Sequence, residues 1–223
     1  IMKLSSNTTM VLKNFATINQ NLVIKEGSEL LTMSSMKNIV AKATVEENFP
    51  KEIAIYDLNE FLASLSIFKS PVLEFEEQYL TIKEEDQPHK KLTYFYSDPS
   101  VVQSPTKTIT MPSEEVKFHL DMNKLLEMKR AAGVIGSPDM VLQKSSGNSS
   151  LLVKDKKNDT ANNYSSDIKT DGDGEYKFFF KVENLKLFDG DYDVKISSKN
   201  ISHFKNDKSN IEYWIALEPE STY

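Results

Sequence analysis

The sequence of 223 residues contains no cysteine and no run of about 18 apolar residues. The first absence excludes a disulfide framework and a thiolate metal site, and it is typical of a reducing compartment. The second argues against a membrane-spanning helix, so we expect no membrane partner. The start of the chain also lacks the apolar core and cleavage site of a signal peptide. Hydrophobic residues at 39% and charged residues at 27% are typical of a folded globular protein.

Arginine is nearly absent, since Arg130 is the only one among 27 lysine and arginine residues. Lysine is a flexible point charge, whereas arginine grips phosphate in a bidentate fork, so a lysine surface suits loose, non-specific phosphate contact. Codon bias in an AT-rich genome would produce the same composition. The net charge of −6 argues against a uniformly basic nucleic-acid binder, but it leaves room for a basic face on an acidic body.

Patterns for catalysis or metal binding are also missing. His89, His119 and His203 lie in different expected elements, and none has a metal-ligand partner at helical spacing. No Gly-rich phosphate loop and no nucleophile elbow occur. The acidic stretch DGDGE (171–175) resembles half a calcium loop, but its Asp-Gly pairs fit a hairpin turn better. We therefore expect no catalytic residues, no cofactor and no metal, although an enzyme with a dispersed site remains an alternative.

The two halves of the chain repeat one order of elements. In the first half, a helix up to Ile18 precedes about three strands, a helix with Asp57 as its N-cap, and three more strands. In the second half, a strand precedes a helix from the N-cap Asp121 to a stop at Gly133, and further strands flank a short helix at VENLKLF (182–188). This repeat predicts an α+β fold with two similar domains, each with two short helices packed on antiparallel sheets.

Between the halves, the stretch SDPSVVQSPTKTITMPSEEV (97–116) holds three of the eight prolines. Proline fixes its own backbone and biases the preceding residue toward an extended conformation. Unstructured connections of about 15 residues are uncommon inside one compact domain. We therefore expect an extended strap. It joins an N-terminal domain, 1–110, which includes most of the strap, to a C-terminal domain, 111–223.

Four stretches carry a family resemblance that spans the chain. They are MKLSSNTTMVLKNFATINQNL (2–22), EIAIYDLNEFLASLSIF (52–68), SDPSVVQSPTKTITMP (97–112) and YWIALEPEST (213–222). In this order and spacing they resemble the sliding clamps of T-even-type bacteriophages, the processivity factors of the replicative DNA polymerase. The stretch 143–176 departs most from the family pattern. The resemblance implies a DNA-clamp fold and a homotrimeric ring, with strands in a continuous outer layer and short helices around duplex DNA.

The resemblance also implies which residues meet each partner. The helix regions that face DNA in the family carry six basic residues here: Lys3, Lys13, Lys124, Lys129, Arg130 and Lys186. A hydrophobic tail of the polymerase is expected in a pocket near the strap, for which the candidate wall residues are Val101, Val102, Ile109, Met111, Trp214, Ile215, Leu217 and Pro219.

Further partners are implied by the same resemblance. They are an ATP-driven clamp loader and late-transcription factors, and the place of action is the host bacterial cytoplasm. The main alternative is a β-rich structural or interaction protein of a phage particle, whose assembly would not depend on duplex DNA.

Overall fold

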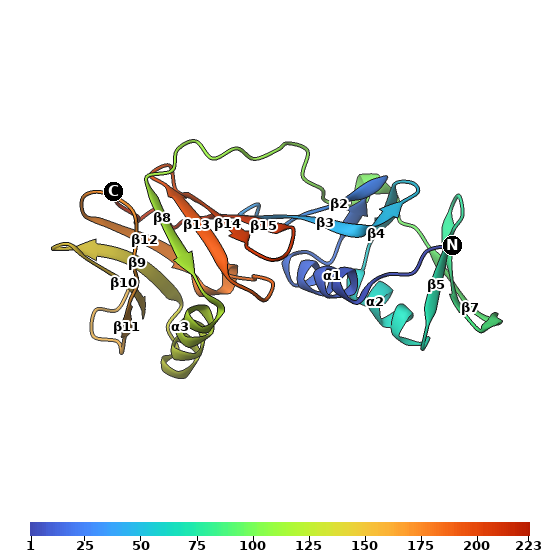
Figure 1. Cartoon of the computed structure of the whole chain (residues 1–223), viewed down its shortest axis with the longest axis horizontal. Helices are drawn as coiled ribbons and strands as arrows, with labels where there is room; N and C mark the ends of the chain where they lie inside the picture. The colour runs from blue at the N-terminus through green and yellow to red at the C-terminus, as the bar shows by residue number, and fades with distance from the viewer. The chain divides into compact units, whose positions relative to one another are not determined.

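The computed structural model describes all residues, Ile1–Tyr223, and the chain divides into two compact units, 1–107 and 108–223 (Figure 1). The division falls inside the strap. Both units combine antiparallel strands with α-helices, which confirms the expected α+β class. None of the helices has the length and apolar character needed to cross a membrane.

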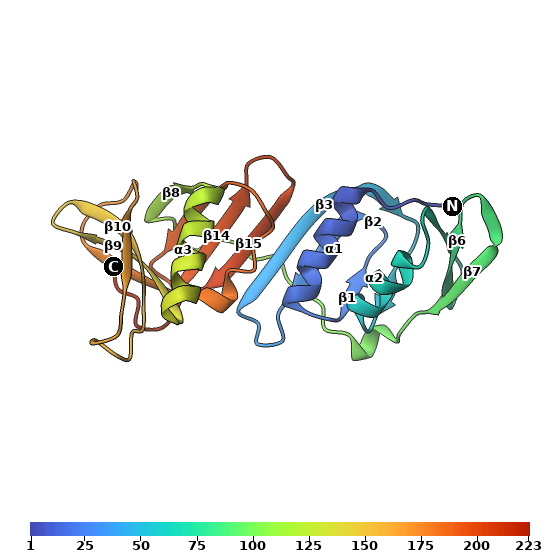
Figure 2. The same ribbon diagram turned by 90° about the horizontal axis from the view of Figure 1, so that it is seen from below.

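Unit 1 packs two helices against paired strands. Strand β2 pairs with β3, β1 pairs with β4, and β5, β6 and β7 form a three-stranded antiparallel sheet in that order. Figure 2 shows α1 lying along β3 with α2 beside it. The elements are α1 (Ser6–Ile18), β1 (Leu22–Ile24), β2 (Gly27–Met33), β3 (Ile39–Phe49), β4 (Ile53–Ile55), α2 (Leu58–Ser66), β5 (Pro71–Phe75), β6 (Tyr79–Glu84) and β7 (Gln87–Phe95).

Local capping explains where the two helices of unit 1 begin. The Ser5 hydroxyl accepts a hydrogen bond from the Thr8 N–H, and the Asp57 carboxylate accepts from the N–H groups of Asn59 and Glu60. These side chains satisfy backbone donors that a first helical turn leaves without partners. Asp57 is therefore confirmed as the cap of the second helix.

Unit 2 contains two four-stranded groups, with the orders β11-β10-β9-β12 and β8-β13-β14-β15. Helix α3 packs against β9, β10 and β11. Buried aromatic side chains, including Tyr192, Phe204 and Tyr213, fill the core. The elements are β8 (Val116–Leu120), α3 (Met122–Ile135), β9 (Asp139–Ser145), β10 (Asn148–Lys154), β11 (Tyr164–Asp167), β12 (Tyr176–Lys181), β13 (Tyr192–Ser197), β14 (Ile201–Asn206) and β15 (Ile211–Ala216).

The expected fourth helix is a single turn of 3₁₀ helix, Val182–Asn184. No side chain caps its start, and the segment that follows buries Leu185, Leu187 and Phe188 together. The Phe188 N–H donates to the Tyr213 hydroxyl at 2.9 Å, so this backbone group bonds to the core instead of to a helix. A short segment without a cap gains too little from helical hydrogen bonds to overcome this packing.

Two turn predictions in unit 2 were wrong. Helix α3 continues past Gly133 and ends at Ile135, and the following Gly136, with a φ of 66°, forms the left-handed cap that glycine favours. The Asp-Gly stretch is not a hairpin turn, because β11 pairs with β10 whereas β12 pairs with β9. Residues 168–175 therefore cross between two strands that are not neighbours, and Asp171 instead forms a bridge to Lys117.

The strap is held at its C-terminal end by Glu115. Its carboxylate accepts hydrogen bonds from the Ser198 N–H at 2.8 Å, from the Ser198 hydroxyl at 2.7 Å and from the Ser113 hydroxyl at 2.9 Å. Burial alone would raise the pKa of Glu115, but these hydrogen bonds outweigh burial and lower the pKa to about 2. The ionised side chain therefore ties the end of the strap to the β13–β14 turn.

Replacing Glu115 by Gln is expected to lower the free energy of unfolding by about 1–2 kcal/mol at pH 7, since hydrogen bonds to a partly exposed charge are lost. The folded pKa lies below the unfolded value of about 4.3, so this stabilisation is fully present above that value. It disappears as the pH falls toward about 2. Urea unfolding of wild type and variant between pH 7 and pH 3 should show the two stabilities converging. Glu26→Gln, at an exposed position, is the control, and a difference independent of pH would contradict the assignment.

Candidate functional site

Helix α1 presents an uncharged polar face with a single cation. Lys13 is exposed on it and forms no ion pair, and the helix contains no acidic residue. The buried face consists of Thr8, Val11, Leu12, Phe15 and Ile18. The charge of Lys13 is therefore uncompensated within its own helix and is available to an anionic partner.

Helix α3 carries two of the expected contacts in different settings. Arg130 is exposed, whereas Lys124 is half-buried, pairs with Glu127 Oε2 at 3.5 Å and donates to the Ser166 hydroxyl of β11. The Tyr164 hydroxyl also donates to Glu127, at 2.8 Å, and this bond contributes most to lowering the pKa of that carboxyl. Arg130 is thus freely presented, while Lys124 belongs to a polar network that joins α3 to β11.

The other three expected DNA-facing residues are more constrained. Lys3 forms an ion pair with Glu85 at 2.5 Å. Lys129 is half-buried, and burial lowers the pKa of its ammonium group although the charge of Asp189 acts in the opposite direction. Lys186 is half-buried just beyond the 3₁₀ turn. Among the six residues, Lys13 and Arg130 are therefore presented most openly.

The expected pocket residues fall into three groups by exposure. Val101 is 59% exposed and Pro219 is also exposed. Three are half-buried, namely Ile109, Met111 and Trp214, and the Trp214 ring lies 5.1 Å from the ring of His203. The remaining three, Val102, Ile215 and Leu217, are buried. Val102 packs with Val23 and Ala54 in unit 1. The buried members can support a docking surface, but only the exposed and half-buried ones can touch a partner.

A cavity of about 810 Å³ in unit 2 contains one of these residues, Pro219. Lys156 lines this cavity and pairs with Glu218 at 3.3 Å and with Glu220 at 2.9 Å. Burial alone would lower the pKa of Lys156, but the two carboxylates raise it. Sequence reasoning did not find this cluster, because its lysine and its two acids lie more than 60 residues apart. The only related feature in the sequence was the pair of acidic residues in the stretch LEPE (217–220).

Family models match both halves of the chain. Residues 3–102 match the family described as DNA polymerase processivity factor, and residues 117–219 match gp45 sliding clamp, C terminal. Two named relatives cover nearly the whole length. A sliding clamp of Vibrio phage KVP40 is 33% identical over 97% of this chain and 99% of its own length. A sliding clamp of Enterobacteria phage T4 is 29% identical over 100% of this chain and 99% of its own length.

Solved structures show the same fold at low sequence identity. A PCNA2–PCNA3 complex from Sulfolobus tokodaii aligns with a TM-score of 0.67 and 13% identity, covering 95% of this chain and 96% of that one. Proliferating Cellular Nuclear Antigen from Entamoeba histolytica aligns with a TM-score of 0.66 and 12% identity, covering 94% of each. These two likenesses confirm the clamp fold. The family models and the whole-length phage relative that is 33% identical show that the chain belongs to the sliding clamp family of DNA polymerase processivity factors.

Proposed function

We propose that three copies of this chain form a ring around duplex DNA and tether the replicative DNA polymerase, without catalysing a reaction themselves. The observation that carries this proposal is the match to phage sliding clamps over 97% of the chain. A clamp must stay on DNA and still move along it. Enclosure supplies the retention, and a few non-specific charges offset the repulsion between the protein and phosphate.

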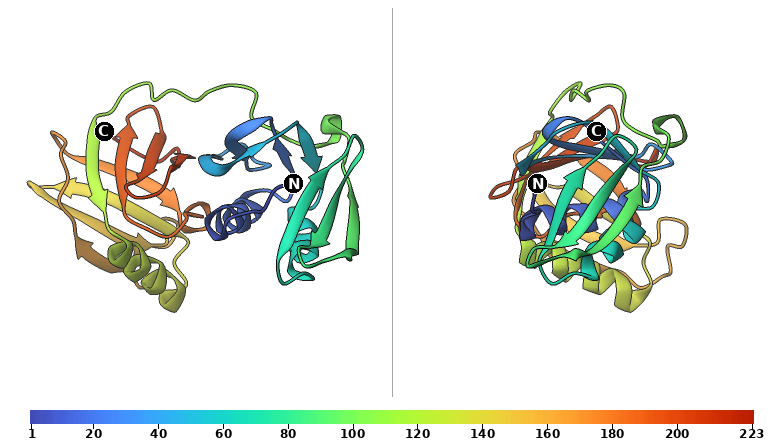
Figure 3. Two further views of the ribbon diagram at one scale, coloured as in Figure 1. Left: turned by 45° about the vertical axis from the view of Figure 1, so that its right-hand side comes forward. Right: turned by 90° about the vertical axis from the view of Figure 1, so that its right-hand side faces the viewer.

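Two free sheet edges support closure of the ring. In unit 1 the β5 edge is bonded to Met2, whereas β7 has no partner on its outer side (green in Figure 3). In unit 2 the β12 edge is bonded to Thr222, whereas β11 has no partner beyond β10. Unpaired edges are templates for pairing with another chain. We propose that β7 of one copy pairs with β11 of the next, a head-to-tail contact that can close into a ring.

The DNA contact that we propose rests on Lys13 and Arg130, with Lys3, Lys124, Lys129 and Lys186 as weaker contributors. Their scarcity fits the function, since many tight phosphate contacts would slow sliding. The acidic balance of the whole chain, with a net charge of −6, would discourage binding of DNA to other faces.

Further partners follow from the same proposal. A polymerase tail would dock on the exposed and half-buried apolar residues identified above, an ATP-driven loader would open the ring, and late-transcription factors would use the loaded clamp. The place of action would be the cytoplasm of the bacterial host.

The assembly itself tests the proposal. Light scattering at micromolar concentration should give three times the chain mass of 25.4 kDa. Addition of the clamp with its loader should lengthen polymerase products on a primed template. A monomer at every concentration, or products of unchanged length, would count against a clamp and in favour of a structural protein.

A negative charge at Val101 should weaken the polymerase contact. Val101 is 59% exposed, so Val101→Glu should fold normally while placing a carboxylate where an apolar tail would bind. We expect binding of the polymerase to weaken about 10-fold or more, which corresponds to about 1.4 kcal/mol. Surface plasmon resonance with immobilised polymerase measures this change. Met36→Glu, at a residue that is 80% exposed, is the matched control, and equal binding by both variants would remove Val101 from the contact.

A further inference from the structure

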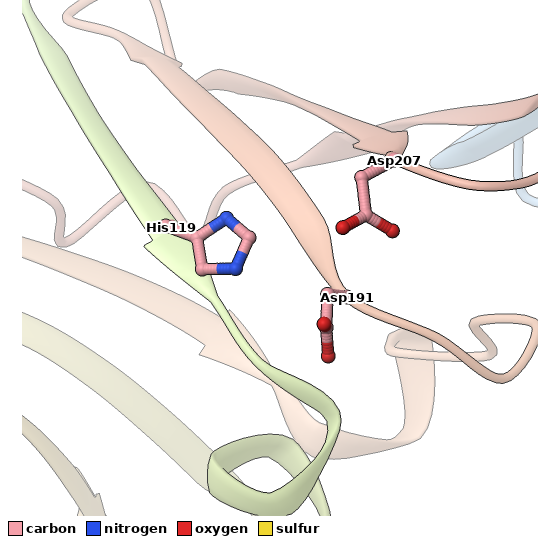
Figure 4. A group of neighbouring side chains, drawn as sticks. All are labelled: His119, Asp191 and Asp207. Atoms are coloured by element: carbon pink, nitrogen blue, oxygen red, sulfur yellow. The ribbon is translucent and has the colours of Figure 1, made fainter.

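Three side chains gather on one face of the unit 2 sheet. His119 lies on β8, Asp191 immediately precedes β13, and Asp207 immediately follows β14. Their potential ligand atoms, one ring nitrogen and one oxygen from each carboxylate, all lie within 4.8 Å of one another. Figure 4 shows the three side chains converging on the same space. His119 and Asp207 are exposed and Asp191 is half-buried, so the group is open to solvent.

Strand pairing produces this convergence. Asp191 and Asp207 continue the β13–β14 pairing and lie opposite each other, where the Asp207 N–H donates to the Asp191 carbonyl at 3.1 Å. His119 lies opposite Asp193 on β13. Side chains alternate between the two faces of a strand, so Asp193 and Asp191 point to the same face. The sheet register therefore fixes both carboxylates and the imidazole on one side.

The two aspartates leave an excess of negative charge. Like charges directly opposite each other on neighbouring strands destabilise a sheet. One oxygen of Asp191 accepts the Met122 N–H at 2.7 Å, which leaves the other available. Neither Asp191 nor Asp207 forms an ion pair with a lysine or arginine. A bound divalent cation would reduce the repulsion between the two carboxylates.

The imidazole of His119 is oriented for coordination. Its Nδ1 lies 3.0 Å from Asp193 Oδ1, and in Figure 4 the other ring nitrogen is turned toward Asp191. Histidines that bind metals commonly donate their second ring N–H to a carboxylate, which fixes the tautomer and increases the basicity of the ligating nitrogen. Asp193 is suited to this positioning role.

We propose that His119, Asp191 and Asp207 bind a first-row divalent transition metal ion, for which Zn²⁺ is the probe. An imidazole among the ligands favours Zn²⁺ over Mg²⁺ or Ca²⁺, which prefer sites made of oxygen alone. Ligands of tetrahedral Zn²⁺ lie about 2.0–2.2 Å from the ion and so about 3.4 Å from each other. Rotation of these accessible side chains brings their atoms together from the present separation. The ion would join the ends of β8, β13 and β14, contrary to the expectation that the chain has no metal site.

Calorimetric titration of the full chain with Zn²⁺ tests this site independently of clamp function. We expect one Zn²⁺ per chain, a higher melting temperature with Zn²⁺, and binding at least 10-fold weaker in both His119→Asn and Asp207→Asn. Asp193→Asn should weaken binding by roughly 10-fold without abolishing it. His89→Asn and Asp173→Asn change an exposed histidine and an exposed aspartate elsewhere, and both should bind as wild type does.

The substituted ligands His119 and Asp207 are exposed, so the variants should keep the fold, which circular dichroism checks. Absence of Zn²⁺ binding by the wild-type chain up to millimolar concentration overturns the proposal. The proposal is also overturned if His119→Asn and Asp207→Asn both bind Zn²⁺ with the affinity of the wild type.

Discussion

Thr93→Pro is expected to convert the proposed ring into single chains. The Tyr96 N–H donates to the carbonyl of Gln78, the residue before β6, and alternation along the strand then directs the Thr93 N–H away from β6, toward the free side of β7. Proline removes that donor and inserts its ring where a neighbouring strand would lie. The β6–β7 hydrogen bonds remain intact. Light scattering should therefore report the mass of one chain at micromolar concentrations where we expect the wild type to be trimeric.

Thr93→Val is the matched control for this experiment, because it keeps the N–H and has a strong preference for strands. It should remain trimeric. Urea unfolding should show that the proline variant still folds as a chain. If Thr93→Pro assembled as well as Thr93→Val, pairing through the β7 edge would be refuted, while the family assignment would stand on its other evidence.

Charge reversal at Lys13 and Arg130 is expected to shorten polymerase products by about 10-fold or more at about 100 mM salt. Each copy would lose two phosphate contacts and gain two repulsive charges, so a ring of three copies would change by twelve charge units. Phosphate contacts act through counterion release, and each contributes about one unit to the slope of log affinity against log salt. Because the variant has fewer phosphate contacts, its affinity depends less steeply on salt, so the defect relative to wild type should shrink as salt is raised. Primer extension on a long circular template, with loader and polymerase present, measures product length.

Lys25→Glu with Lys199→Glu is the matched control, since both residues are exposed and form no ion pair. This double variant has the same net charge as Lys13→Glu with Arg130→Glu but leaves the proposed DNA face unchanged. It should support products of normal length. Equal defects in the two double variants would show that total charge matters rather than the faces of α1 and α3.

The sequence predicts the helices and strands well where a local signal determines them. Asp57 begins α2 because its carboxylate caps two N–H groups, and Asp121 begins α3 by accepting from Lys124. The prediction fails where distant residues compete. The Tyr213 hydroxyl accepts the Phe188 N–H, which a helix at 182–188 would have used. Gly136 forms the left-handed cap of α3, so the helix does not stop at Gly133.

In the candidate site, too, local features could be predicted from the sequence and contacts between distant residues could not. The family resemblance named Lys13 and Arg130, and both are exposed cations in the structure. Spacing is also consistent with the i,i+3 pair of Lys124 and Glu127. It could not show that Lys3 is engaged by Glu85, because these two residues lie 82 positions apart in the sequence. The convergence of His119 with two aspartates depends on the register of three strands. Register is fixed by packing across the sheet, so no sequence pattern at helical spacing could reveal it.

The polar network around Lys124 has a thermodynamic consequence for the proposed ring. Lys124 and Glu127 connect α3, the helix proposed to meet phosphate, to Ser166 and Tyr164 of β11, the strand proposed to meet the next copy. Phosphate near α3 would compete with Glu127 for this lysine and so alter how β11 is held. Because such coupling is reciprocal, DNA occupancy and opening of the ring should change each other's equilibrium constants by the same factor. A loader that separates β11 from β7 of the next copy would then require a different free energy to open a DNA-bound ring than to open an empty one.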